Sequence, residues 1–152
     1  MTQTEIESLI RKIFESIERQ IPKFKDSPKD WQICEGNVAL CIIDQNGRIF
    51  GKLFGQDKIK QRQIYDIAWR KASQVWITGY KTGEYEKLVF AGKINPNDYG
   101  IELPDLMGWE GGQPIKLDEE TKISVGFGGF RGINDLDIVI KAIDEALKGR
   151  KF

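Results

Sequence analysis

The chain has 152 residues, with 23 basic side chains, 23 acidic side chains and no histidine. This length predicts a single domain over residues 1–152, large enough to bury an apolar core of its own. The even charge balance argues against nucleic acid or an anionic membrane surface as a partner. Without an imidazole, histidine-dependent catalytic triads and histidine metal sites are excluded, and no metal site is expected.

The cysteine residues and the lengths of the apolar runs indicate in which cellular compartment the protein works. Cys34 and Cys41 form no CxxC pair, so we interpret them as small buried residues rather than as zinc ligands or a disulfide. The longest apolar run, Val38–Ile43, has six residues, far fewer than the ~20 needed to span a bilayer. Charged residues interrupt the first twenty positions, which excludes a signal peptide there. We therefore expect a soluble, cytoplasmic protein.

Isoleucine residues define the first predicted helix, which covers residues 3–21. They recur at spacings of four and three and so share one face: Ile6, Ile10, Ile13, Ile17 and Ile21. Thr2 and Glu5 fit a capping box, and Pro22 ends the helix because proline lacks the backbone donor. Residues 23–30 are predicted to be a polar connector.

A β-hairpin is predicted after this connector. Val38–Ile43 suits a strand that is buried on both faces, and Asp44–Gly47 has the composition of a tight turn. The return strand is Arg48–Phe54, in which apolar and basic residues point to opposite sides.

One long helix is predicted at Lys58–Tyr80. It carries two apolar stripes, one with Ile64, Ile67, Ala68, Ala72 and Val75 and one with Tyr65, Trp69, Ala72, Trp76 and Tyr80. A helix with such a wide apolar surface is usually buried on two sides. The aromatic stripe is therefore interpreted as core and subunit interface, with a wall for a planar ligand as the alternative. Asp66 is expected to pair with Arg70 one turn later. The basic run, which consists of Lys58, Lys60, Arg62, Arg70 and Lys71, is interpreted as a solvated helix face, with binding of an acidic ligand as the alternative.

The last part of the chain is predicted to hold a second hairpin and a closing helix. The elements are a short helix at Glu84–Ala91, an irregular segment at Ile101–Gln113, strands at Pro114–Leu117 and Lys122–Phe127, and a helix capped by Asn134 and ended by Gly149. An irregular segment of this length is more often functional than idle. The order α-ββ-α-ββ-α predicts an α+β fold with an antiparallel sheet packed against helices.

The passage Gly126–Gly132 is rich in glycine and leads from a strand into the closing helix. Such a passage can present backbone N–H groups to an anion, and Arg131 could bind a carboxylate or phosphate through two hydrogen bonds. The G-x-G-x-x-G pattern fails because Arg131 occupies the place of the third glycine, and no P-loop is present. Tight backbone packing is favoured, with part of a ligand pocket as the alternative.

Four stretches, taken in their order and spacing, resemble the GlcG/HbpS-like family, which is also called the haem-degrading-domain family. Ile43–Gly47 matches the pattern V-D-x-x-G, Ile67–Ala72 matches I-A-x-x-K-A, and Gly111–Ile115 matches G-G-x-P-I. Val125–Gly129 only approximates G-V-S-G, because Phe127 or a glycine stands in place of the serine. The resemblance covers residues 35–148.

The resemblance implies a sheet of about five antiparallel strands flanked by helices, assembled into a homodimer or a larger homo-oligomer. It also implies binding of a small molecule or a tetrapyrrole, since some members bind haem. Family members can use histidine as the axial haem ligand, which this chain cannot do. Haem would need Cys41, Met107, Tyr99 or Lys71, or no axial protein ligand, so the cofactor stays unknown.

Three functions are left open by the sequence. The favoured one is a ligand-binding oligomer with a pocket formed by Trp69, Arg70, Met107, Trp109, Gly111, Gly112, Gly128, Gly129 and Arg131. The second is an acid–base enzyme without a metal, acting on a small carboxylate or carbonyl compound through Asp66, Glu110 and Arg131. The third is a structural module in which the aromatic stripe forms a seam between subunits.

Overall fold

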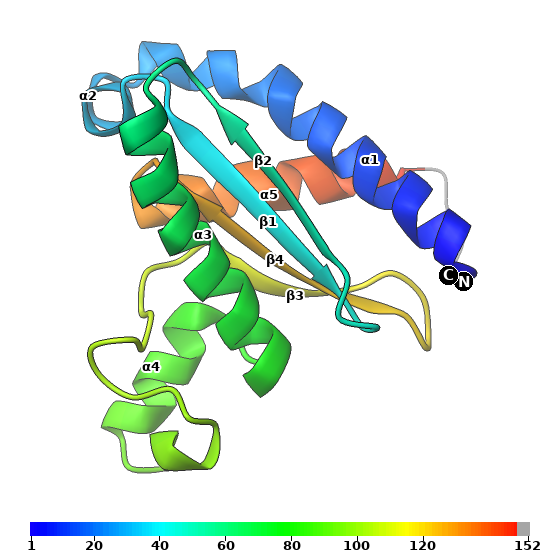
Figure 1. Ribbon diagram of the computed structural model, residues 1–152, viewed down its shortest axis with the longest axis vertical. Coiled ribbons are helices and arrows are strands. Elements are labelled where there is room, and N and C mark those ends of the chain that lie inside the picture. The colour runs from blue at the N-terminus through cyan, green and yellow to red at the C-terminus, as the bar shows by residue number, and fades with distance from the viewer. Residues whose placement is uncertain (149–152) are drawn as a thin grey trace.

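A four-stranded antiparallel sheet with the strand order β2-β1-β4-β3 lies at the centre of the molecule, and helices cover both of its faces (Figure 1). The structure is a computed structural model that describes residues 1–148. Its strands are β1 (Val38–Asp44), β2 (Ile49–Phe54), β3 (Gly112–Lys116) and β4 (Lys122–Gly128). The expected α+β class and antiparallel sheet are confirmed, with four strands in residues 1–148 rather than about five.

The helices are α1 (Gln3–Gln20), α2 (Pro28–Cys34), α3 (Lys58–Thr78), α4 (Thr82–Phe90) and α5 (Gly132–Leu147), together with the 3₁₀ turns η1 (Ile21–Asp26) and η2 (Pro96–Asp98). The connector predicted at residues 23–30 is therefore largely helical. Pro22 and Pro28 stand in the first positions of η1 and α2, where a missing N–H costs no hydrogen bond. The predicted helix end at Gly149 lies outside the described residues.

The first helix begins as its sequence indicates. The Thr2 hydroxyl accepts a hydrogen bond from the backbone N–H of Glu5, whose carboxylate accepts the N–H of Thr2 at 2.7 Å. This reciprocal capping box satisfies two N–H groups that the helix leaves free. The isoleucine stripe that follows is buried against α5 and the sheet.

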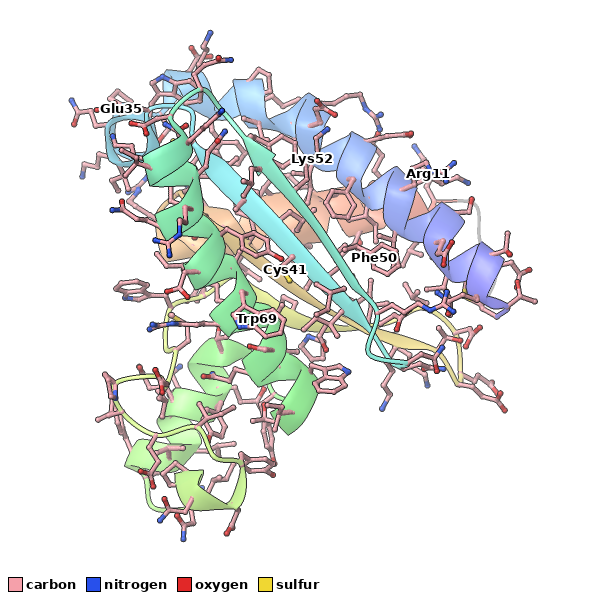
Figure 2. The ribbon with its side chains drawn as sticks, in the orientation of Figure 1. Arg11, Glu35, Cys41, Phe50, Lys52 and Trp69 are labelled. Atoms are coloured by element: carbon pink, nitrogen blue, oxygen red, sulfur yellow. The ribbon has the colours of Figure 1, made fainter. Side chains whose placement is uncertain are left out.

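The side chains of β1 alternate between two packed layers. Val38, Leu40 and Ile42 join the core beneath α1 and α5, whereas Ala39 and Cys41 pack against α3 on the opposite face. Figure 2 shows the Cys41 side chain close to α3. All of these side chains are fully buried, which confirms that β1 is a strand covered on both faces.

Small residues allow α3 to lie very close to the sheet. A Cβ atom added at Gly126 would lie 2.2 Å from the carbonyl oxygen of Ala68 and 2.6 Å from the amide nitrogen of Ala72. Such distances are far inside van der Waals contact, so only glycine fits at this point of β4. The close approach fixes the height of α3 above the strands.

The start of α5 differs from the prediction. Arg131 stands at the N-cap position and the helix begins at Gly132, so Asn134 is already inside the first turn. The Asn134 amide instead donates a hydrogen bond to the carboxylate of Asp30 in α2. The predicted cap is therefore wrong, because this side chain is used for a contact between two helices.

The segment between α4 and β3 is irregular except for η2, as predicted. In Figure 1, α4 and this segment extend beyond the end of the sheet, below α3. Two side chains tie the segment down: the hydroxyl of Thr82 donates to the carbonyl of Trp109 at 2.6 Å, and that of Tyr85 to the carbonyl of Ile101 at 3.3 Å. The segment is therefore attached to α4 by side chains that hold its backbone.

We expect Gly126→Ala to destabilise the protein by about 1–3 kcal/mol, because the new methyl group would push α3 away from β4. The matched control is Gly83→Ala in α4, where an added Cβ meets no atom closer than 3.6 Å. Alanine is the better helix former, so this control is expected to be neutral or slightly stabilising. Equilibrium unfolding in urea measures both, and equal stability of the two variants would contradict the close packing of α3.

Candidate functional site

A buried ion pair joins the two helical layers where β4 leads into α5. The ammonium group of Lys71, in α3, donates hydrogen bonds to the Oδ2 atom of Asp135 at 3.0 Å and to the carbonyl oxygen of Phe127 at 2.8 Å. The exposed fractions of the two charged side chains are 1% and 3%. Removing two charges from water is costly, so the stability of this pair depends on the hydrogen bonds that the surrounding backbone makes with both groups.

Asp135 lies in the first turn of α5, and both of its oxygen atoms are engaged. Oδ2 accepts from Lys71, and Oδ1 accepts the backbone N–H of Phe130 at 2.8 Å. Burial raises the pKa of Asp135 to about 7, although the charge of Lys71 and both hydrogen bonds act in the opposite direction. This carboxyl group can therefore gain or lose a proton near neutral pH.

A second buried carboxylate, Asp30 of α2, anchors the residues just before α5. It accepts the backbone N–H of Arg131 at 2.8 Å and the Nε and Nη2 atoms of the same residue at 3.2 Å. Burial acts to raise the pKa of Asp30, but hydrogen bonds from Arg131, Ser27 and Asn134 outweigh it and hold that pKa well below its ordinary value. Asp30 thus stays ionised and fixes the guanidinium group.

These groups border a cavity of about 410 Å³, which we call the main cavity because the buried ion pair lines it. Two hollows of similar volume, about 450 and 430 Å³, lie beside β3 and over β2. Its lining comes from α2, α3, the irregular segment and the passage from β4 to α5: Ile33, Ile64, Ile67, Lys71, Trp109, Gly129, Phe130, Arg131, Gly132 and Asp135. The ion pair forms the buried end of this lining, whereas Arg131 and Trp109 are largely exposed, at 44% for the Arg131 side chain and 64% for Trp109. The main cavity therefore has apolar walls with charges at both ends.

The structure corrects the interpretation of Lys71. It was assigned to the solvated face of α3, but it is 1% exposed and lies beside the buried residues Ala68, Ala72 and Val75. Its place within the apolar stripe was the available signal, because a lysine on a buried face needs a charged partner. Neither its partner Asp135 nor Asp30 was among the candidate site residues of the sequence.

Three of the proposed ligand-binding residues, Trp109, Gly129 and Arg131, line the main cavity. Trp69 and Arg70 instead line a second hollow of about 240 Å³, on another side of α3. Asp66, a catalytic candidate, lies in this second hollow and forms the predicted ion pair with Arg70 at 3.2 Å. The side chains of Asp66 and Arg70 are both largely exposed, so this ion pair is an ordinary contact on a helix surface.

The remaining candidates lie in other places. Glu110, Gly111 and Gly112 border a third hollow of about 270 Å³ beside α4. Met107 is buried, and its N–H and carbonyl both bond to the side-chain amide of Gln74 at 2.8 Å. Gly128 belongs to β4, where an added Cβ would lie 3.2 Å from the backbone of α3. The expected pocket is therefore divided over three hollows.

The donors considered for haem iron are also separated. Cys41 is buried beneath α3, where it accepts the Tyr65 hydroxyl at 3.7 Å, and Tyr99 packs edge-on against Tyr85. Of the four candidates only Lys71 lines the main cavity, and Asp135 holds its ammonium group. These residues do not fit a haem ligated by the protein in this cavity.

No group of three or more cysteine, aspartate or glutamate residues within 1–148 is placed to hold a metal ion. No helix in the same range is both long and apolar enough to cross a membrane.

Comparison with solved structures shows the fold. ORFY of Klebsiella pneumoniae, of the family DUF336, superposes with a TM-score of 0.67 at 16% identity, over 95% of this chain and 90% of the other. A double mutant of HbpS of Streptomyces reticuli gives 0.62 at 17%, over 92% and 86%. PduOC in complex with haem gives 0.62 at 17%, over 97% and 95%.

No family model and no curated protein matches the sequence. The chain has the fold of the GlcG/HbpS-like proteins, and the resemblance expected from its sequence is confirmed at this level. At such low identities the likeness concerns the fold, and the ligand must be inferred from this chain's own residues.

We expect Lys71→Met to destabilise the protein by about 3–5 kcal/mol, because it leaves a carboxyl group buried without its cation. Adding Asp135→Asn should recover about half or more of this loss, since the amide still accepts the N–H of Phe130. The control is the exposed pair, where Asp66→Asn should cost no more than about 0.5 kcal/mol. Urea unfolding of the wild type, of Lys71→Met and Asp135→Asn alone and of the double variant gives the coupling energy, and simple additivity of the two buried changes would contradict it.

Proposed function

We propose that the protein binds a small, flat and largely apolar molecule in the main cavity, and that it does so as a homo-oligomer. The observation that carries this proposal is the lining, which combines apolar and aromatic side chains with a few fixed charged groups. Ligand sites have this composition, with volumes of about 300–1,000 Å³. At about 410 Å³ the main cavity suits a ligand of a few fused rings.

The walls favour a flat ligand. The isoleucine side chains Ile64 and Ile67 of α3 form one wall, and the Trp109 ring and Phe130 contribute aromatic surface. Phe130 is held in place by stacking on Phe24, with ring centroids 4.6 Å apart. An apolar ligand placed here would gain roughly 25 cal/mol for each Å² of apolar surface that it covers.

Charge also limits the ligand. Four charged groups lie at or next to the main cavity, and they balance: Lys71 with Asp135, and Arg131 with Asp30. Nε and Nη2 of Arg131 bond to Asp30, while no protein acceptor within residues 1–148 bonds to its Nη1 atom. The exposed guanidinium edge therefore supports a ligand with an acidic group, as the sequence proposed for Arg131.

A tetrapyrrole is one member of this class, and the haem complex of PduOC, a protein with the same fold, supports considering it. In this chain such a ligand would be held by aromatic rings and arginine, without histidine ligation. Other flat acids have the same chemistry, so the proposal concerns the class rather than haem alone.

Self-association is the second part of the proposal. β2 is an edge strand, and its residues Ile49 and Leu53 are about half exposed, as is Trp76 of α3 near the hairpin turn. Figure 2 labels Phe50 and Lys52 on the same strand, and Lys52 pairs with Glu18 of α1 at 2.9 Å. Open edges with apolar neighbours favour contact with another chain. This surface supports a seam on the β2 side of α3.

An acid–base enzyme is the second candidate function. Its support is Asp135, a carboxyl group with a pKa of about 7 in the wall of the main cavity, which is a suitable value for proton transfer at neutral pH. Asp66 and Glu110 line other hollows.

The single domain, the cytoplasmic location and the absence of nucleic acid as a partner stay predictions from composition.

Filling the main cavity should abolish ligand binding. We expect Ile67→Trp to weaken binding of an apolar anionic dye, anilinonaphthalene sulfonate, by at least about tenfold, because the indole would occupy the ligand's space. The control is Ile77→Trp, which places the same ring in the second hollow. Fluorescence titration measures both, and haemin is titrated in parallel. If haemin gives no saturable Soret shift, the protein does not bind a tetrapyrrole. If both variants bind the dye equally well, the main cavity is not the binding site.

Light scattering tests the proposed seam. We expect Trp76→Lys to lower the molecular mass of the particle in solution, because a charge would be placed in a desolvated interface. Phe90→Lys is the matched control, since Phe90 of α4 is exposed by 65% and lies away from β2. An unchanged mass for Trp76→Lys would mean that the seam lies elsewhere.

A further inference from the structure

The buried end of the main cavity has a hydrogen-bond donor that the protein does not use. An ammonium group has three N–H bonds, and Lys71 directs two of them to Asp135 and to the carbonyl of Phe127. No third acceptor for Lys71 is found within residues 1–148, although its side chain is 1% exposed and borders the cavity. The nitrogen is thus paired twice by the protein, and an acceptor that a ligand brings from the cavity side would complete the three bonds of this ammonium group.

The irregular segment holds the ammonium group of Lys71 in place. An added Cβ at Gly111 would lie 3.0 Å from the Nζ atom of Lys71 and 2.8 Å from the Cβ atom of Asp135, so the irregular segment closes tightly over the pair. The backbone carbonyl of Gly111 in turn accepts the N–H of Phe127 at 3.1 Å. Lys71 therefore cannot swing away, and an acceptor has to approach from the cavity.

The charges around the pair decide which acceptor fits. Asp135 is faced by Lys71 from α3 and by the Asp30 carboxylate of α2, and Arg131 precedes it at the N-cap; Glu110 of the irregular segment comes close to Gly132. A ligand carboxylate on Lys71 would place one cation between two carboxylates beside an ion pair whose side chains are almost fully buried. Two like charges at such a distance strongly disfavour double ionisation.

We propose, building on the ligand-binding function above, that the main cavity takes a flat monocarboxylate whose carboxylate accepts the third N–H of Lys71, and that Asp135 takes up a proton as this ligand binds. The proton comes from solvent, so the bound site holds one ammonium, one ligand carboxylate and one neutral carboxyl group. Protonated Asp135 keeps its contact with the N–H of Phe130 through Oδ1. The net charge of the site, which is zero for the ion pair alone, is therefore zero again once the ligand and the proton are bound.

The pH dependence follows from the proton count. Free Asp135, with a pKa of about 7, already carries its proton in slightly acidic solution, and binding there takes up none. Above that pKa the proton must be taken from solvent, so the affinity for a carboxylate falls by roughly tenfold for each pH unit. A neutral ligand of the same shape has no such dependence.

Calorimetric titration of the full chain with naphthoate tests this, with naphthamide as the neutral ligand of matched shape. At about pH 8, in two buffers of different ionisation enthalpy, naphthoate should bind with uptake of close to one proton, and at about pH 6 with close to none. Naphthamide should show no uptake at either pH. Asp135→Asn should bind naphthoate with an affinity that no longer changes over this range.

The controls separate this inference from the function on which it rests. Lys71→Met should lose naphthoate binding, whereas Lys116→Met, which removes a cation from β3 outside the main cavity, should not. Binding of naphthoate without proton uptake, or a preference for naphthamide at about pH 6, overturns the inference and leaves the cavity as a ligand site. If neither compound binds, both the inference and the proposed function for flat ligands are wrong. The proton uptake measured on the wild-type protein tests the inference even if a variant fails to fold.

Discussion

The buried pair of Lys71 and Asp135 is the interaction on which the two layers of the molecule depend. It links α3, on one face of the sheet, to α5, on the other, across a separation of 64 residues. Burying two charges costs several kcal/mol for each ion unless hydrogen bonds and attraction offset it. Here the carbonyl of Phe127 and the N–H of Phe130 provide those bonds. The passage from β4 to α5 is therefore shaped to serve the pair, and the cavity beside it is a result of that shape.

Close packing explains why this passage and the irregular segment are rich in glycine. Gly126 admits α3, Gly111 admits the ion pair, and Gly129, at φ 130°, turns the chain where a Cβ would lie 2.6 Å from Val38. Tight backbone packing and a ligand pocket were weighed as alternatives for the passage. The structure confirms the close backbone packing, and Gly129 also lines the main cavity, where a ligand site stays a proposal.

The fold was largely predictable because its elements repeat with clear periods. The isoleucine stripe of α1 and the two-sided apolar run of β1 each report a local environment. The site was not predictable in the same way. Trp69 and Lys71 are two positions apart, which on a helix points them to different sides, so one faces the second hollow and the other the main cavity. The burial of Lys71 depends on Asp135, and no local pattern connects them.

The fold alone does not transfer a haem ligand to this chain. PduOC binds haem in the same fold, but this chain has no histidine, and its cysteine and methionine candidates lie away from the main cavity. The main cavity has largely apolar walls, with the twice-bonded ammonium group of Lys71 at its buried end and the half-exposed Arg131 guanidinium group at its rim. Electrostatic preference in such a site is set by which groups are already paired. Because Asp30 neutralises Arg131 and Asp135 neutralises Lys71, the proposal allows an acid to bind either at the rim without a proton or at the buried end with one.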